Sequence, residues 1–227
     1  MAAAPVALGA FGALPTTVDA DDQAAADAAV ALFNDRLTQA EWTSTGPFTE
    51  SEPDETEETE FGTCLNGFEL YLDYTDVRLD GETARAFSHN FEFASREPTP
   101  TDTVGDYGYA GAVVITTDES AVATLDTFVA QLGDPDTVGC MMDQPAFDEI
   151  TDVAITNQAD VGVGDASARL DLAASMSYEG GELTTAATFA AARVDRSLVV
   201  VVAGGSGTAA SALDPIAELA AMVGTFD

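Results

Sequence analysis

The chain has 227 residues, 46% of them hydrophobic, and this length suffices for one large or two small domains with a buried core. Forty acidic residues stand against seven basic ones, all of them arginine, so the formal net charge at pH 7 is −33. Nucleic acids and anionic membranes are bound through clusters of Lys and Arg, and this composition therefore argues against both as partners.

The first segment in chain order is apolar and built from small residues. Ala2 to Pro15 is similar to the hydrophobic part of a secretory signal without its basic leader, so residues 1–18 are expected to be signal-like or disordered. No stretch reaches the ~18 apolar residues that cross a bilayer, and no membrane insertion is expected. A helix is predicted from Asp21 and Asp22, which can cap it, to Gln39, because apolar residues recur on one face.

The acids are densest between Thr43 and Glu60, where seven carboxylates occur without a basic residue. This composition predicts a loop. Its section from Glu50 to Glu60 is either a solvated run of charge or a weak Ca²⁺ site, since Ca²⁺ binds several oxygen ligands. The other acids are spread along the chain, which favours adaptation of the surface to high salt over a dedicated cation-binding task.

Alternation of apolar and polar residues predicts three strands in the first half of the chain. They cover Phe68 to Tyr74, Thr83 to Phe93 and Tyr109 to Thr116. Asp80-Gly81 is a turn signal between the first two strands. Asp118 can then cap a helix that ends at Gly133.

The second half begins with four predicted strands. They cover Thr151 to Thr156, Ala168 to Met176, Leu183 to Val194 and Ser197 to Ala203. Tight turns at Glu179-Gly180-Gly181 and at Asp195-Arg196 are expected to join the last three strands into an antiparallel meander. A closing helix reaches Val223, with Pro215 in its first turn.

Each half thus runs from strands into a strand–turn–helix unit. YAGAVVITTDESAVATLDTFV and RSLVVVVAGGSGTAASALDPIAEL align as the same pattern. We therefore predict an α+β fold in which helices pack on one face of antiparallel sheet. The two pseudo-repeated halves, residues 19–142 and 149–227, would form a single domain, 19–227, around a cleft, where ligand sites tend to lie.

The two cysteines, Cys64 and Cys140, are 76 positions apart. Together with the single histidine, His89, they fall short of the four or so ligands of a structural zinc site, so we expect neither a metal nor a cofactor. The cysteines either form one disulfide or remain two unrelated thiols. We favour the disulfide, which would stabilise the fold by roughly 4 kcal/mol and would indicate an oxidising compartment.

Two motifs invite a chemical interpretation. Gly205, Gly207 and Ala210 match the spacing of a dinucleotide-binding loop, but the preceding strands are predicted to be antiparallel and no strand follows. The chain also lacks the Lys of a phosphate loop, and we interpret GSGTAA as a strand-to-helix connection. Ser88 and His89 are neighbours in a predicted strand and point to opposite sides of the sheet, so they do not form a catalytic pair by themselves.

The order of the elements, together with GDASARL and FAAARVDRSLVVVVAG, resembles the extracytoplasmic sensor domains of actinobacteria that are typified by the C-terminal domain of the kinase PknH. The resemblance extends from about Asp19 to Phe226, and its most specific pieces are Gly164-Asp165-x-Ser167 and Arg193 to Val200. It implies a two-part α/β fold with a central cleft for an unidentified ligand, outside the cytoplasm. Members often have two disulfides, whereas this chain can form only one.

Four residues are candidates for contact with such a ligand. An anionic ligand would need one or two of the scarce arginines, and Arg85 and Arg193 are the candidates, with an ion pair to a carboxylate as the alternative for each. Tyr107 and Tyr109 are candidate walls of the groove, or else core or surface aromatics.

These observations predict a secreted or cell-envelope sensor-like domain, monomeric, that binds an unknown small molecule and performs no catalysis. The alternative is a secreted hydrolase whose Ser/His or carboxylate site is assembled only in the folded protein. A structural envelope protein without a small ligand is the third hypothesis.

Overall fold

The structure is a computed structural model, and it describes part of the chain. The described residues are 20–47, 68–69, 77–79, 82–84, 87–89, 92–96, 106–117, 119, 122–142, 151–178, 181–206 and 213–226. The leader 1–18, the acidic run 50–60, Cys64 and Arg85 lie outside them.

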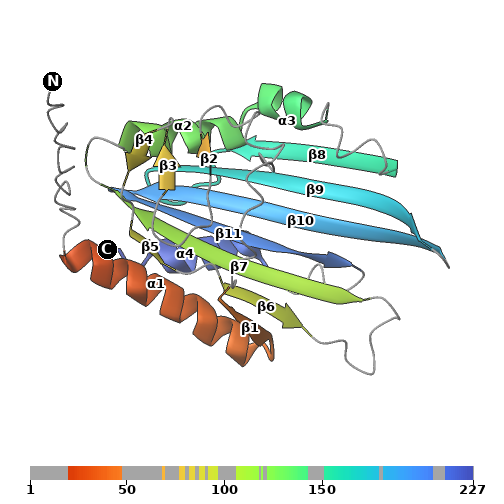
Figure 1. Ribbon diagram of the computed structural model, residues 1–227, viewed down its shortest axis with the longest axis horizontal. Helices are drawn as coiled ribbons and strands as arrows, with labels where there is room; N and C mark the ends of the chain where they lie inside the picture. The colour runs from red at the N-terminus through yellow and green to blue at the C-terminus, as the bar shows by residue number, and fades with distance from the viewer. Residues whose placement is uncertain are drawn as a thin grey trace, which may run out of the picture.

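An antiparallel sheet of eight strands forms the centre of the fold (Figure 1). Its strands are β1 (Thr43–Pro47), β5 (Phe87–His89), β6 (Glu92–Arg96), β7 (Tyr107–Thr116), β8 (Thr151–Ala159), β9 (Ala166–Tyr178), β10 (Gly181–Val194) and β11 (Ser197–Ser206). They are ordered β1-β6-β7-β11-β10-β9-β8, and β5 pairs with β7 as well. A separate three-stranded sheet contains β2 (Phe68–Glu69), β3 (Val77–Leu79) and β4 (Glu82–Ala84). The predicted α+β class is confirmed.

The predicted meander of β9, β10 and β11 is also confirmed. β10 pairs with β9 from Gly181 opposite Tyr178 onward, and with β11 up to Val194 opposite Ser197. The second connection is the predicted two-residue turn, in which Asp195 has a φ of 48°. Asp tolerates this left-handed conformation better than most residues, which explains why it occupies the turn.

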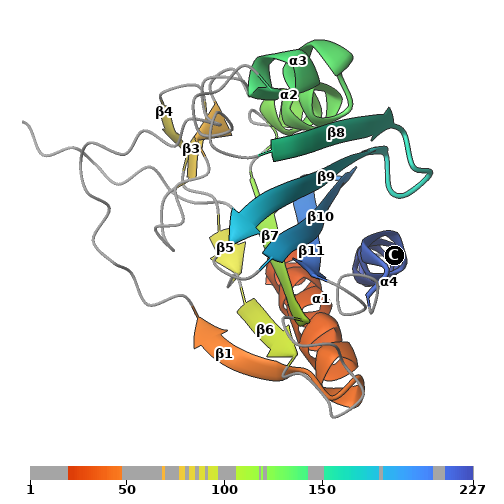
Figure 2. The ribbon, with the colours of Figure 1, turned by 90° about the vertical axis from the view of Figure 1, so that its right-hand side faces the viewer.

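Helices cover both faces of the large sheet, whereas the sequence pattern suggested one (Figure 2). α1 (Ala20–Gln39) and α4 (Pro215–Val223) pack on one face, and α2 (Val122–Leu132) and α3 (Pro135–Met142) pack on the other. Along β7, Val114 lies in the core under α1 and α4, while Val113 and Ile115 lie in the core with α2. Successive strand residues point to opposite faces, so a strand that is apolar at every position needs a cover on both sides. The prediction of a single helical layer was wrong for this reason.

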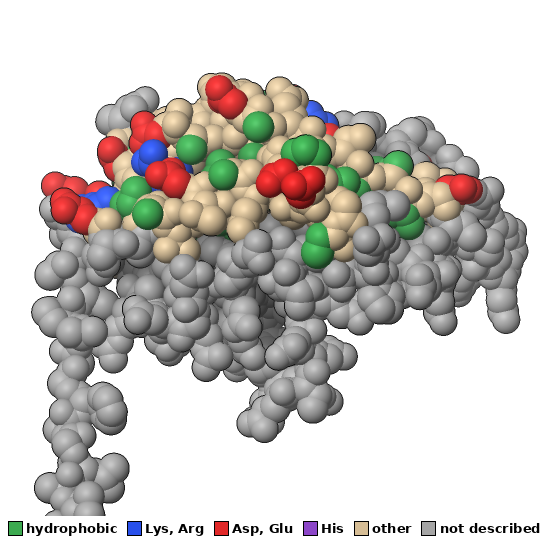
Figure 3. All heavy atoms as spheres, turned by 90° about the horizontal axis from the view of Figure 1, so that it is seen from above, with side chains coloured by type: hydrophobic (Ala, Val, Ile, Leu, Met, Phe, Trp, Pro, Cys, Tyr) green, Lys and Arg blue, Asp and Glu red, His purple; other side chains and the backbone are tan. Residues whose placement is uncertain are grey.

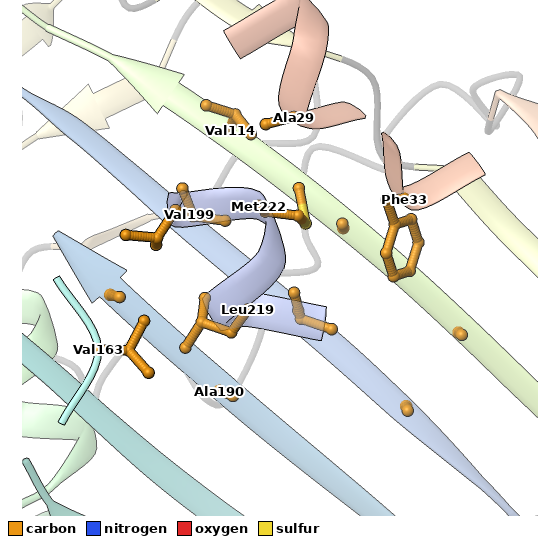
Figure 4. Close-up of a cluster of buried hydrophobic side chains, with 14 of the residues drawn as sticks. Ala29, Phe33, Val114, Val163, Ala190, Val199, Leu219 and Met222 are labelled. Carbon is orange, nitrogen blue, oxygen red and sulfur yellow. The ribbon is translucent and has the colours of Figure 1, made fainter. Parts of the chain in front are cut away.

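The core beneath α1 and α4 is built from side chains at helical spacing (Figure 4). The buried stripe of α1 consists of Ala26, Ala29, Phe33 and Leu37. In α4, Leu219 and Met222 are fully buried, and Asp214 caps the helix by accepting hydrogen bonds from two backbone N–H groups, with Pro215 in the first turn as predicted. Burial of each large apolar side chain of this kind stabilises the fold by about 1.5–3 kcal/mol.

Three elements were not expected from the sequence: α3, β3, which lies between two predicted strands, and β1, which forms where a loop was predicted. α3 follows α2 after Gly133 and Asp134, and the Asp134 carboxylate accepts a hydrogen bond from the backbone N–H of Asp136 at 3.0 Å. β1 contains Gly46 and Pro47, and it forms as an edge strand because β6 pairs with it. The predicted strand Thr83 to Phe93 is divided among β4, β5 and β6, and residues 70–76 and 80–81 lie outside the described part of the chain.

The two predicted halves share one sheet. β7, from the first half, pairs with β11, from the second half, over ten residues from Tyr107 opposite Ser206 to Thr116 opposite Ser197. The strand–helix units diverge after this pair, because α2 and α4 pack on opposite faces. The pseudo-repeat and the cleft are not confirmed, and the division into residues 19–142 and 149–227 stays a prediction.

Candidate functional site

The Arg193 guanidinium is enclosed by carboxylates at one end of β10. It forms an ion pair with Asp126 of α2, donates from Nη1 to Asp165 Oδ2 at 2.8 Å, and donates to the backbone carbonyl of Asp195 at 2.9 Å. Its side chain is 15% exposed. Burial would by itself lower the pKa of Arg193, but the hydrogen bonds and charges of Asp126 and Asp165 outweigh it and raise that pKa above its ordinary value.

The GDAS segment organises this same junction. Gly164 has a φ of 63°, and a Cβ there would lie 2.4 Å from the carbonyl oxygen of Arg193. The backbone N–H of Asp165 donates to that carbonyl at 2.7 Å. Ser167 Oγ accepts from Val161 and donates to Asp160, which closes the loop between β8 and β9. The motif that carried the family resemblance is thus explained by packing and hydrogen bonding of a loop against a turn.

Most described arginine side chains are held in ion pairs in the same way. Arg36 pairs with Glu218, Arg169 with Asp171, and Arg196 with Asp22. For Arg193 the ion-pair alternative therefore describes its contacts, and its role toward a ligand stays a prediction. Arg85 lies outside the described residues.

Tyr107 and Tyr109 form a pair at the opposite end of the central strands. Two positions apart on β7, they face the same side of the sheet, and their rings are nearly parallel, at 20°, with centres 6.5 Å apart. Tyr107 is 39% exposed, and it is the large apolar side chain that remains exposed among the described residues. Its hydroxyl lies 3.3 Å from Thr185 Oγ1 on β10, so the side chain reaches across the intervening strand β11.

Two glycines of β11 make room for the tyrosine pair. Gly204 lies opposite Tyr109, and a Cβ at Gly204 would be 2.5 Å from both Cζ and the hydroxyl oxygen of Tyr109. At Gly205, with a φ of 150°, a Cβ would be 2.1 Å from the carbonyl oxygen of Tyr107. Gly205, the first residue of the motif that resembled a nucleotide loop, thus serves close packing in an antiparallel strand, and Gly207 and Ala210 lie outside the described residues.

Tyr109 is a neutral phenol over the ordinary pH range. Its burial and the neighbouring Tyr107 raise its pKa above 10.0. The pair therefore presents two aromatic rings and their hydroxyl groups. An arrangement of this kind can bind by stacking, by cation–π contact or by hydrogen bonds to the hydroxyls.

The predicted ligand residues are only partly brought together. Ala187 of β10 lies opposite Gly204, six positions before Arg193, which places Arg193 about 20 Å along the sheet from Tyr109. The sequence alone does not show this separation, because Arg193 and the two tyrosines lie on different strands. Thr185 of β10 contacts the Tyr107 hydroxyl, although β11 lies between the two strands. The sequence analysis missed Thr185, because nothing in the sequence around it indicates this contact.

Other candidate chemistry receives no support from the described part of the chain. Ser88 and His89 are adjacent on β5, opposite Ile115 and Val114 of β7. The described residues contain no group of three His, Cys, Asp or Glu side chains that could hold a metal ion. Cys140 is not a free thiol, while Cys64 lies outside the described residues, and their pairing stays a prediction.

On the face shown in Figure 3, acidic side chains are scattered across the described region and arginine side chains are few. Within the described residues no helix combines the length and hydropathy that a membrane crossing requires.

Comparison with known proteins gives one weak likeness. No protein-family model and no curated protein matches the sequence. A solved structure, LpqN involved in cell envelope biogenesis of Mycobacterium tuberculosis, is similar with a TM-score of 0.27 and 16% identity, covering 64% of this chain and 72% of that chain. A likeness at this level carries no argument about function, and the resemblance to sensor domains stays a prediction.

Proposed function

We propose that this protein is an extracytoplasmic binding domain, without catalytic chemistry, that takes a small molecule on the tyrosine pair of β7. The observation that carries the proposal is the position of Tyr107: an aromatic ring 39% exposed, parallel to a second ring, with its hydroxyl held by Thr185. Exposed aromatic side chains that are fixed by neighbours are typical of ligand contacts, since little side-chain entropy is lost on binding.

The location outside the cytoplasm is supported by two features of the chain. The apolar segment from Ala2 to Pro15 is similar to the core of an export signal. Cys140 is not a free thiol, as expected for an oxidising compartment. We further propose a sensor-like role, which rests on the family resemblance, and a monomeric state.

Ring-labelled tyrosine NMR tests the proposal directly, because the chain has five tyrosines and substitution assigns their signals. Three probes cover the main ligand classes: tetramethylammonium, glucose and benzoate. We expect at least one probe to shift the Tyr107 and Tyr109 ring signals in the parent protein, and the shift of Tyr109 to be lost in Tyr107→Ala.

Thr184→Ala is the matched control. Thr184 is exposed and precedes Thr185 on β10, so its side chain lies on the opposite face of the same strand. The control should bind like the parent. If no probe shifts the signals of the pair, or if Tyr107→Ala binds as well as the parent, the site is not on these residues.

A further inference from the structure

The charge of the protein restricts what can dock on the tyrosine pair. A net charge of −33 over 227 residues gives a negative potential that attracts cations and repels anions, over a range of ~10 Å at 0.1 M salt. An anionic ligand would need a local positive charge to offset this potential. A neutral ligand gains nothing from it.

The arginines whose side chains the structure describes do not supply such a charge on this face. Arg36, Arg169, Arg193 and Arg196 are each held by carboxylates. Arg96, at the end of β6, pairs with Gly108 between the two tyrosines. Arg96 is two positions after Ala94, so both side chains point to the same face of the sheet, and Ala94 is buried in the core under α1. The tyrosine pair lies on the other face, because Ala94 pairs with Ala110, the neighbour of Tyr109 on β7.

The rings themselves supply what an organic cation needs. The face of a tyrosine ring is the negative part of its quadrupole, and cations placed over it gain roughly two- to thirtyfold in affinity, depending on how well they are desolvated. Because burial and Tyr107 raise the pKa of Tyr109, the ring stays a neutral phenol at ordinary pH. A tightly hydrated metal ion would find no described cluster of ligands here, whereas a weakly hydrated ammonium needs only the ring faces.

We infer that the ligand of the tyrosine pair carries an organic cation of the quaternary-ammonium class. The inference rests on the proposed function, since it names the chemistry of the same site. It combines the π-faces of Tyr107 and Tyr109 with the overall negative potential, and it requires no charged side chain in direct contact.

Choline and 3,3-dimethyl-1-butanol test the inference, because they have the same shape and differ in the positive charge. Both are titrated against the full-length protein at 0.15 M NaCl, with ring-labelled tyrosine NMR as the readout. We expect choline to bind at least fivefold more tightly than the neutral alcohol. The preference should persist in Tyr107→Phe, which keeps the ring, and disappear in Tyr107→Leu, which removes it. High salt should reduce the preference for choline, since it screens the long-range attraction between the cation and the negatively charged protein.

Arg96→Gln, measured with choline and with benzoate, tests whether Arg96 supplies a positive charge to the site despite its place on the opposite face. Removing this positive charge should leave choline binding unchanged or make it tighter. If benzoate binds and Arg96→Gln weakens it, or if the neutral alcohol equals choline, the cation inference is overturned while the tyrosine site stands. If no probe perturbs the signals of the pair, the proposed function fails together with the inference.

Discussion

Replacement of Gly204 by alanine should destabilise the fold and disturb the candidate site at once. The added Cβ would lie 2.5 Å from the ring end of Tyr109 and 2.7 Å from the backbone carbonyl oxygen of Ala186. The ring can rotate away, but the carbonyl belongs to the ladder between β10 and β11 and can move little. Ordinary contacts of this kind are 3.4 Å or longer, so the strands must separate locally by several tenths of an ångström.

The expected cost is about 1–3 kcal/mol, the usual range for an added methyl group in a packed site. For a protein of this length each kcal/mol lowers Tm by about 2–4 °C, so Tm should fall by about 2–12 °C. Differential scanning calorimetry measures the change. Because the Tyr109 ring must also leave its position over β11, its NMR signal should shift and probe binding should weaken.

Gly139→Ala is the matched control, since nothing lies within 4 Å of a Cβ at this position in α3. There the same substitution should raise stability by about 0.5–1 kcal/mol, because Ala favours a helix over Gly. In the double variant Gly204→Ala/Tyr109→Ala the clash with Ala186 remains, so stability should not recover. If Gly204→Ala has the Tm of the parent, the close approach of the ring and both strands is incorrect.

Three further predictions concern the loop between β8 and β9, the ionisation of Tyr109 and the cysteines. Gly164→Ala should lower the free energy of unfolding, measured in urea, by about 2–4 kcal/mol, because a positive φ and a Cβ 2.4 Å from a carbonyl oxygen both destabilise the variant. Gly162→Ala is the control: its φ is 76° but the Cβ enters open space, so the loss should be about 1 kcal/mol. Equal losses would contradict this packing. The pKa of Tyr109 is raised in the folded state, so its contribution to stability is complete below pH 10.0 and is lost as the pH rises above that value. Calorimetry at high pH should therefore show a smaller loss of stability with pH for Tyr109→Phe than for the parent protein. Intact mass spectrometry without reductant should show a deficit of about two hydrogens for a Cys64–Cys140 disulfide, and a full-thiol mass would refute the pairing.

The sequence by itself determined the local elements of the second half. β9, β10, β11 and α4 were all predicted, because their signals are local: alternating or continuous apolar residues, Asp195 at a two-residue turn, and Pro215 in a first helical turn. Pairing of consecutive strands through short turns leaves few alternatives, so the meander followed from the same signals.

The scarcity of arginine also pointed to the correct type of contact but not to the partners. Ion pairing was the expected alternative for Arg193, yet Asp126 and Asp165 are 67 and 28 positions away in the chain. With forty carboxylates to choose from, no spacing rule selects two of them. The partners are decided by where α2 and the β8–β9 loop pack.

Only the tertiary structure decided which helix covers which face of the sheet and what the tyrosines contact. A run such as Leu198 to Val202 indicates burial on both sides, but the pattern does not say which helix covers which side. Tyr107 meets Thr185 because β7 and β10 both flank β11, an order set by long-range strand pairing. Strand periodicity determines which residues of a strand share a face of the sheet, whereas pairing between distant strands determines which of these residues become neighbours.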